Sequence, residues 1–127
     1  MPDDTSFTER ELDIMSVLWG AGSGTVAEVR EALPVELGYT SVLKMLQILA
    51  EKGMVRHEQE GRAYRYYPTV EPDEAGGHAL NRIVDKIFQG SAELALARLV
   101  SERRLSTEEV GRLKALLDEA AEQEDAS

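Results

Sequence analysis

The sequence predicts a mainly helical fold, in which a winged helix-turn-helix domain of α+β type over residues 1–70 is followed by an all-helical unit over residues 71–127. Three observations support this prediction. Three segments with helical hydrophobic spacing come first, two short segments rich in β-formers follow at hairpin spacing, and the chain beyond Pro68 has helical periodicity throughout. A length of 127 residues suits one ordinary domain or two small units and excludes a large two-lobed enzyme.

The first helix is marked by a capping box and an apolar stripe. The Thr8 hydroxyl can cap the helix while Glu11, three residues on, reaches back to it. The glycine-rich stretch 20–24 ends the pattern, so we expect a helix over residues 9–19. Its apolar positions at helical spacing are Leu12, Met15, Leu18 and Trp19.

The second and third helices are predicted from a further capping box and from a two-sided hydrophobic pattern. Thr25 with Glu28 opens a short second helix, which a proline ends. The third helix is capped by Thr40 or Ser41 and stops at Gly53, because glycine readily takes a left-handed conformation. Its core-facing side consists of Val42, Leu43, Leu46, Leu49 and Ala50, and the opposite side is mostly polar.

A β-hairpin is predicted after the third helix. Residues 54–59 and 62–67 are rich in β-formers, and Glu60-Gly61 joins them at hairpin spacing. Because side chains alternate along a strand, Tyr64 and Tyr66 share one face, with Arg65 and Tyr67 on the other. We therefore expect at least one tyrosine pair to belong to the core of the wing.

Beyond Pro68 the sequence predicts three short helices and a polar tail. Pro72 suits the first turn of one helix, Ser91 and Ser106 can cap the other two, and the tail from Glu122 is expected to fray. A unit of about 55 residues has little core of its own in which to bury such wide apolar stripes. We expect it to form a homodimer, with packing back onto the first domain as the alternative. The expected dimer contacts are Leu80, Ile83, Val84, Ile87, Phe88, Leu96, Leu99, Leu113 and Leu117.

The charge is unevenly distributed along the chain. The 24 acidic and 14 basic residues give a net charge of −10, which argues against a non-specific polyanion binder. Residues 38–68 nevertheless carry five basic and three acidic side chains, so this segment has a charge of +2 and the remainder −12. This basic island coincides with the third helix and the hairpin.

Several classes of protein are excluded by what the sequence lacks. Without cysteine there is no disulfide framework, thiolate metal site or cysteine nucleophile. No uncharged apolar run approaches the ~18 to 20 residues that span a bilayer, and the acidic start Met1–Asp4 is unlike a signal peptide, so we expect a soluble cytoplasmic protein with no membrane partner. His57 and His78 lack metal-type spacing, and we expect no metal, no cofactor and no enzymatic activity.

The order of helices and hairpin indicates a nucleic-acid-binding surface, with residues 40–52 as the candidate recognition helix and residues 56–65 as the wing. Hydroxyl and amide side chains can bond bases or phosphates, and cations can contact phosphates or a guanine edge. Taken alone, the Thr-Ser pair would simply be a helix cap. The candidate contacts to double-stranded DNA are Tyr39, Thr40, Ser41, Lys44, Gln47, Arg56, Arg62 and Arg65.

Three stretches resemble the penicillinase-repressor family of BlaI/MecI/CopY type, namely residues 39–49, 51–55 and 61–68. The opening residues 8–15 and the helical tail are also similar, so the resemblance spans roughly residues 7–119. It implies a homodimeric winged-helix repressor that occupies a dyad-symmetric operator and blocks transcription. The C-terminal helices would then form the dimer interface.

The sequence departs from that family's pattern at three points. Ile48 stands where relatives commonly carry a basic residue, so one phosphate contact is missing. The cysteine cluster of copper-sensing relatives is absent, which argues against copper control. In β-lactam-responsive relatives a sensor protease cleaves an Asn-Phe bond, and the corresponding pair here is Arg98-Leu99, which argues against inheritance of that switch.

A winged-helix protein-interaction adaptor without direct DNA binding is the alternative hypothesis, because a fold does not fix a function. The two hypotheses predict different surfaces over residues 38–68. A DNA-binding protein places the cations of this island on one face, whereas an adaptor shows an apolar patch there.

Overall fold

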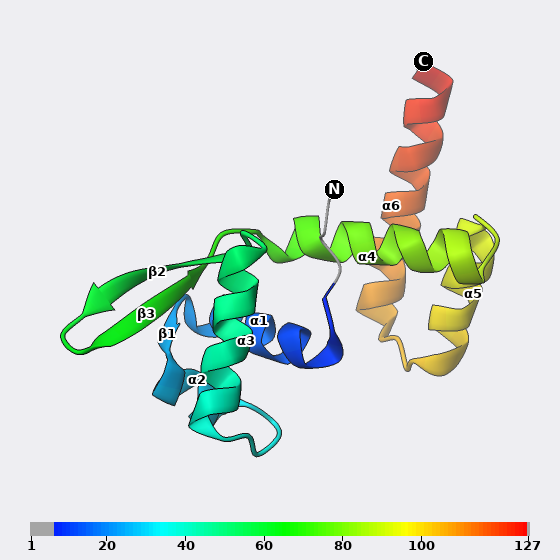
Figure 1. The fold of residues 1–127 in the computed structure, drawn as a ribbon. Coiled ribbons are helices and arrows are strands. Elements are labelled where there is room, and N and C mark those ends of the chain that lie inside the picture. Colours follow the sequence, from blue (N-terminus) through cyan, green and yellow to red (C-terminus); the bar gives the residue numbers. More distant parts are fainter. Residues whose placement is uncertain (1–6, 127) are drawn as a thin grey trace. The chain divides into compact units, whose positions relative to one another are not determined.

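The computed structural model describes residues 7–126 and divides into two compact units, one up to Arg82 and the other from Ile83 (Figure 1). The acidic start Met1–Asp4 lies outside the described residues. The compact first unit extends past residue 70 into the following helix, and the functional boundary at that residue stays a prediction.

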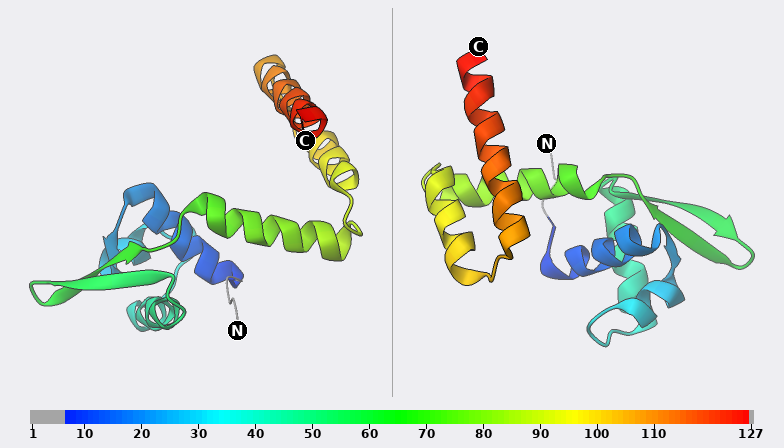
Figure 2. Two further views of the ribbon diagram at one scale, coloured as in Figure 1. Left: turned by 90° about the horizontal axis from the view of Figure 1, so that it is seen from above. Right: turned by 180° about the vertical axis from the view of Figure 1, so that it is seen from behind.

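In the first unit, three helices precede a β-hairpin, and a short strand joins the hairpin to make an antiparallel sheet in the order β1-β3-β2. Glu60 pairs with Ala63 at the tip of the hairpin, and Gly24 pairs with Tyr66 where the short strand is added. The hairpin extends beyond the helices as a wing in each view of Figures 1 and 2. The elements are α1 (Glu9–Ala21), β1 (Gly24–Thr25), α2 (Val26–Ala32), α3 (Tyr39–Glu51), β2 (Val55–Glu60) and β3 (Ala63–Pro68).

Both predicted capping boxes of the first unit are present. The Thr8 hydroxyl accepts from the Glu11 amide and the Glu11 carboxylate accepts from the Thr8 amide, and Thr25 and Glu28 form the same pair at α2. Each box satisfies two amide groups that a helix start would otherwise leave without a partner. Helix α1 runs two residues past Trp19 because its left-handed stop is Gly22, with a φ of 90°.

The predicted cap of α3 was wrong. Gly38 is the N-cap residue, its backbone is extended, and no side chain caps this helix. Thr40 and Ser41 instead lie in the first turn of α3, where both are exposed. Their hydroxyls therefore make no capping hydrogen bond. The stop at Gly53 is confirmed by its φ of 79°.

The hairpin is confirmed, but its turn lies one residue later than predicted. Gly61 and Arg62 form the two-residue connection, since Glu60 and Ala63 are already paired. Gly61 occupies the first turn position with a φ of 64°, the left-handed conformation that a type II′ turn demands there. The shift places Arg62 in the turn itself. Strand β1 was not predicted, because two residues are too few to show an alternating pattern.

The core of the first unit is formed by α1, α2, α3 and the base of the hairpin. On α3, the buried side chains are Val42, Leu46 and Leu49, which fixes the opposite side of the helix as its exposed face. The core side chains are Ile14, Met15, Leu18, Val26, Val29, Leu33, Val42, Leu46, Leu49, Met54, Val55 and Tyr66.

A partly buried ion pair holds the end of α3 against the start of α1. The Lys52 ammonium donates to both carboxylate oxygens of Glu11, at 3.0 and 3.2 Å, and only 5% of Glu11 is exposed. The same carboxylate accepts from the Thr8 amide at 2.9 Å. Glu11 therefore caps one helix and anchors another.

The second unit is helical, as predicted. Ser91 accepts from the Leu94 amide at the start of α5, and Ser106 accepts from the Glu109 amide before α6. Helix α6 includes the residues after Glu122, because alanine and glutamate are strong helix formers, and fraying of this tail stays a prediction. None of the helices in the described part of the chain is long and apolar enough to cross a membrane. The helices are α4 (Pro72–Ile87), which spans the division between the units, α5 (Ala92–Glu102) and α6 (Thr107–Ala126).

Two glycines at the end of α1 should respond oppositely to substitution by alanine. A Cβ on Gly20 would meet no atom within 4 Å, so Gly20→Ala should raise the free energy of unfolding of the first unit. The gain should be about 0.5 kcal/mol, because alanine is the better helix former. Gly22→Ala should lower it by about 1 kcal/mol, because Gly22 is left-handed. Urea denaturation followed by circular dichroism measures both, and an equal effect of the two substitutions would contradict this account.

Candidate nucleic-acid interface

The exposed face of α3 carries the hydrogen-bonding side chains of the predicted recognition helix. Thr40, Lys44 and Gln47 lie within 60° of one another around the helix axis at 100° per residue, opposite the buried side chains. Glu51 continues this face at the end of the helix. Tyr39, at the first position, is 49% exposed. The amino-terminal half of α3 therefore presents neutral donors and one cation.

The wing has two chemically different faces. Cross-strand pairing puts His57, Tyr64 and Tyr66 on one face, where the His57 ring meets the Tyr64 ring edge-on with centroids 4.8 Å apart. Tyr66 is 3% exposed and belongs to the core, whereas Tyr64 is 47% exposed. Burial raises the pKa of Tyr66, so its phenol remains neutral. The opposite face carries Arg65.

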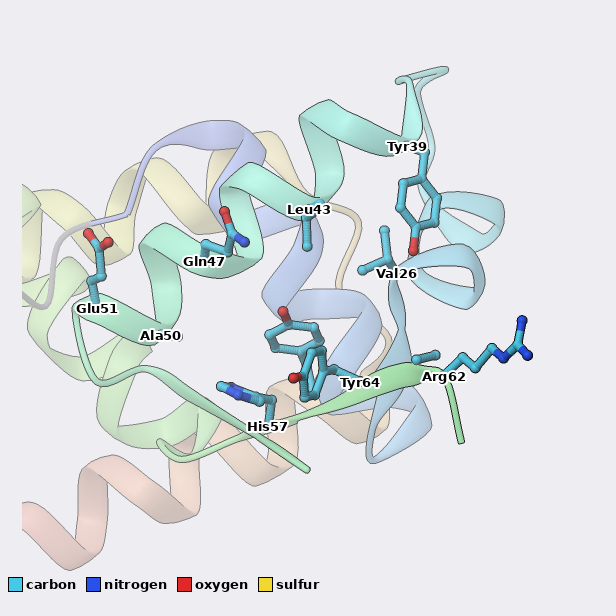
Figure 3. Close-up of a pocket in the computed structure, with 11 residues that line it drawn as sticks. Val26, Tyr39, Leu43, Gln47, Ala50, Glu51, His57, Arg62 and Tyr64 are labelled. Carbon is cyan, nitrogen blue, oxygen red and sulfur yellow. The ribbon is translucent and has the colours of Figure 1, made fainter. Parts of the chain in front are cut away.

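A groove runs between α3 and the first face of the wing. Figure 3 shows Tyr39 and Leu43 on the α3 side, Tyr64 projecting from the wing toward the helix, and His57 on the wing nearer to Ala50. Arg62, at the end of the hairpin, borders the groove with the base of its side chain, while its guanidinium points outward (Figure 3). The walls are thus mainly aromatic and aliphatic, with a cation at the outer end.

Three of the five cations of the basic island are engaged within the chain. Lys52 pairs with a carboxylate of α1, Arg56 pairs with Glu58 and lies 4.2 Å from the centroid of the Tyr67 ring, and Arg65 pairs with two carboxylates. Within the part of the chain that the structure describes, Lys44 and Arg62 form no ion pair. One lies on the exposed face of α3 and the other in the turn of the wing.

Arg65 is held by a dense set of hydrogen bonds. Its guanidinium donates to both carboxylate oxygens of Glu28, at 2.9 and 3.1 Å, and to both oxygens of Glu60, at 2.8 and 3.0 Å. These bonds hold the pKa of Glu28 and that of Glu60 below the ordinary value, and raise the pKa of Arg65. This pairing could not be predicted from local spacing, since Arg65 and Glu28 are 37 positions apart.

The structure brings some of the predicted contact residues together and separates others. Tyr39 and Gln47 line the groove, with Arg62 at its outer end, and Thr40, Ser41 and Lys44 are exposed on α3 outside the groove lining. Arg56 and Arg65 lie on the other face of the hairpin. The predicted set missed His57 and Tyr64. Strand alternation could have indicated both, because it places them on the face of Tyr66.

No group of three or more metal-ligating side chains occurs among the described residues. Arg98 and Leu99 lie inside α5, and Arg98 forms an ion pair with Glu102 one turn on. Their peptide bond is therefore part of a regular helix.

Comparison with known proteins gives four concordant findings. The family model described as "Penicillinase repressor" matches residues 7–119. "Transcriptional regulator BlaI" of Mycobacterium tuberculosis is 33% identical over 119 residues, which is 91% of this chain and 85% of that protein. The DNA-binding domain of the repressor BlaI, a solved structure, is similar over 58% of this chain and 93% of its own, with 28% identity and a TM-score of 0.52. YusO of Bacillus subtilis, at 21% identity, shares the fold with a TM-score of 0.55 over 93% of this chain and 77% of its own.

The Arg65 ion pairs predict the titration of two carboxyl groups. Because Arg65 favours the charged forms, Glu28 and Glu60 should each titrate below the ordinary value of 4.5. Both pKa values should return toward 4.5 in Arg65→Gln. The pairs stabilise the fold above the unfolded pKa, and this stabilisation is lost as pH falls through the lowered values. Side-chain carboxyl ¹³C NMR measures the titrations, and ordinary values in the wild type would contradict the pairing.

Proposed function

The chain belongs to the penicillinase repressor family and is a DNA-binding transcriptional repressor, and we propose that it acts as a homodimer on a dyad-symmetric operator, which it contacts through α3 and the wing. The second unit would supply the dimer contacts. Members of such a family regulate transcription and are not enzymes, and a cytoplasmic location follows from the need to reach operator DNA.

The observation that carries the proposal is the placement of Lys44 and Arg62. An ammonium on the exposed face of α3 and a guanidinium in the wing turn are each free of intrachain ion pairs in the described part of the chain. Phosphates can therefore bind them without first displacing a carboxylate. A protein with a net charge of −10 can still bind DNA through such groups, because interactions within about 8 Å dominate at physiological salt.

The geometry of α3 suits the major groove. A recognition helix contacts base edges with its amino-terminal residues. On α3 these are Tyr39, Thr40 and Ser41, all exposed, and Thr40 and Ser41 are not engaged as caps. The Lys44 ammonium can reach a phosphate or the acceptors of guanine, and Gln47 can bond adenine. We assign Arg62 to the backbone or minor groove beside this contact.

Arg56 and Arg65 have a weaker claim to DNA contact. Both lie on the side of the hairpin away from the groove, where Arg65 is bound to two carboxylates and Arg56 to one. Arg65 would have to break its pairs to bind a phosphate, whereas Arg56 has a single exposed pair and is set apart by its position on the other face. We keep both within the wing and give the direct contact to Arg62.

The proposed dimer interface rests on the exposure of apolar side chains in the second unit. No side chain from residue 83 to residue 124 is buried. A unit with no buried core cannot offset the entropy of ordering its backbone, so a second copy is the economical way to cover it. Of the predicted contacts, Leu80, Ile83, Ile87, Leu99 and Leu117 are between 44% and 63% exposed, while Val84, Phe88, Leu96 and Leu113 are half-buried.

The two copies of a symmetric dimer would present two identical α3–wing surfaces. Such a protein matches an operator whose half-sites are related by a dyad. Its negative remainder disfavours non-specific DNA, since like charges repel. Affinity for the operator should therefore depend on a few well-placed contacts.

The release mechanism is a separate matter from operator binding. A sensor protease that cut at Arg98-Leu99 would have to unwind α5 first, because that bond is helical. A signal that weakens the dimer would release DNA without any cleavage. We therefore do not assign a protease partner to this chain.

Removing either free cation should weaken operator binding. Lys44→Ala and Arg62→Ala should each reduce affinity by about tenfold and lower the slope of log affinity against log salt by about 0.9, since each removes one phosphate or base contact. Gel shift on the native promoter fragment, with dimer mass checked by light scattering, measures this. Arg82→Ala is the matched control, because Arg82 lies on α4 opposite its apolar stripe. Two variants that bind like wild type would contradict the assigned surface.

A charge on the apolar face of the second unit should separate the two copies. Ile87→Glu, at a side chain that is 63% exposed, should give a monomer, because an unpaired carboxylate is costly to bury. Operator affinity should fall by more than tenfold while half-site binding persists. His78→Glu, on the other side of α4, should remain dimeric. Analytical ultracentrifugation measures the oligomeric state of both variants. A dimeric Ile87→Glu would contradict the proposed interface and favour packing of the helices back onto the first unit.

A further inference from the structure

Arg65 joins the two strands of the hairpin to α2, which is distant from them in the sequence. Its side chain lies on β3, Glu60 ends β2, and Glu28 lies in the first turn of α2. Both carboxylates are bound through two oxygens each, and the Ser23 hydroxyl accepts a further bond at 3.2 Å. Although each glutamate is 56% exposed, the Arg65 side chain is only 20% exposed.

The Glu28 carboxylate is itself fixed by the backbone. The oxygen that accepts from Arg65 at 2.9 Å also accepts from the Thr25 amide at 3.2 Å, as part of the capping box of α2. Thr25 is in turn the β1 partner of Arg65 in the sheet. The carboxylate therefore has its position set before Arg65 binds it, which reduces the entropy lost in forming the ion pair.

The Glu60 carboxylate lies next to the turn of the wing. Glu60 pairs with Ala63, and only Gly61 and Arg62 separate them. Whatever restrains Glu60 thus restrains the residue that carries the free guanidinium. A two-stranded ribbon on its own is marginally stable and twists readily, so the tip of an isolated hairpin has no fixed place.

The direction in which Arg65 projects excludes it from the groove. His57, Tyr64 and Tyr66 face α3, and alternation along β3 puts Arg65 on the reverse side of the wing. Its hydrogen bonds are directed at two carboxylates and a hydroxyl. All five N–H donors of the guanidinium are used in these bonds, so none is left for DNA.

We propose that Arg65 is a positioning residue, which clasps the wing to α2 through Glu28 and Glu60 and thereby sets where Arg62 meets DNA. This inference rests on the proposed contact by Arg62. It reassigns Arg65 from contacting DNA to orienting the side chain that does. Lysine can replace arginine only in part at this position, because its ammonium cannot bind two carboxylates through paired parallel hydrogen bonds.

A double-mutant cycle tests whether Arg65 acts through Arg62. Arg65→Gln should lower operator affinity by about fivefold to tenfold in the wild type, and should have little further effect in Arg62→Ala. Lys44 lies on another element, so in the Lys44→Ala background Arg65→Gln should reduce operator affinity as much as it does in the wild type. Equal losses in all three backgrounds would overturn the proposal, because they would show that Arg65 binds DNA itself. Binding unchanged by Arg65→Gln would overturn it as well. The operator affinity of Arg65→Lys should lie between that of Arg65→Gln and that of the wild type.

Two glutamates of the wing provide a matched pair of substitutions. The proposal predicts that one of them weakens DNA binding, although removing a negative charge should by itself strengthen it. Glu58→Gln and Glu60→Gln remove the same charge from the same strand, and both would strengthen DNA binding if only long-range repulsion mattered. Glu58 pairs with Arg56 and Glu60 with Arg65. We expect Glu60→Gln to bind the operator several-fold more weakly than Glu58→Gln. Equal affinity of the two variants would contradict the clasp.

A measurement without DNA separates failure of the clasp from failure of the proposed function. In ¹⁵N relaxation, the amide order parameters of Gly61 and Arg62 should drop in Arg65→Gln and stay unchanged in Arg56→Gln. A rigid wing tip in Arg65→Gln would overturn the clasp whether or not the protein binds DNA. If the tip becomes mobile in Arg65→Gln and the wild-type protein itself binds no duplex, the clasp is upheld and the proposed DNA contact is contradicted.

Discussion

The packing of Val42, Leu46 and Leu49 into the core fixes the direction in which α3 faces, and the rest of the interface depends on it. A helix that buries one side must present the other, so Thr40 and Lys44 become exposed without any interaction of their own. The Lys52 ion pair with Glu11 then holds the end of this helix to the start of α1. The orientation of the recognition surface is thus a consequence of hydrophobic burial, locked by one partly buried charge pair.

The role of each cation in the basic island depends on where the fold places it. The basic island has a net charge of only +2, too small to predict DNA binding by itself. The fold divides its cations by role. Lys52, Arg56 and Arg65 form ion pairs within the protein, while in the described part of the chain Lys44 on the exposed face of α3 and Arg62 in the wing turn form none. Lys44 and Arg62 fit the DNA-binding hypothesis, whereas the aromatic and aliphatic walls of the groove are what the adaptor hypothesis expects. The match to a family of DNA-binding repressors favours the first hypothesis.

Features encoded by neighbouring residues were predictable from the sequence, and those that depend on distant residues were not. The capping boxes at Thr8 and Thr25 and the buried side of α3 follow from spacings of three and four residues. The predicted capping of α3 by Thr40 or Ser41 was wrong, because Gly38 already has the extended backbone that an N-cap needs. The role of Arg65 was missed for a different reason, since its partner Glu28 reaches it only through the tertiary fold. The dimer contacts stay predictions, because a second copy is what would reveal them.

The most direct test of the central claim is to map where DNA touches the protein. A duplex selected from a random pool would be titrated into the ¹⁵N-labelled full chain, and amide shifts recorded residue by residue. The account predicts the largest shifts from Tyr39 to Gln47 and at Gly61 and Arg62, with small shifts at Arg65. Shifts concentrated in α5 and α6, with α3 and the wing tip unaffected by a duplex that binds, would contradict it.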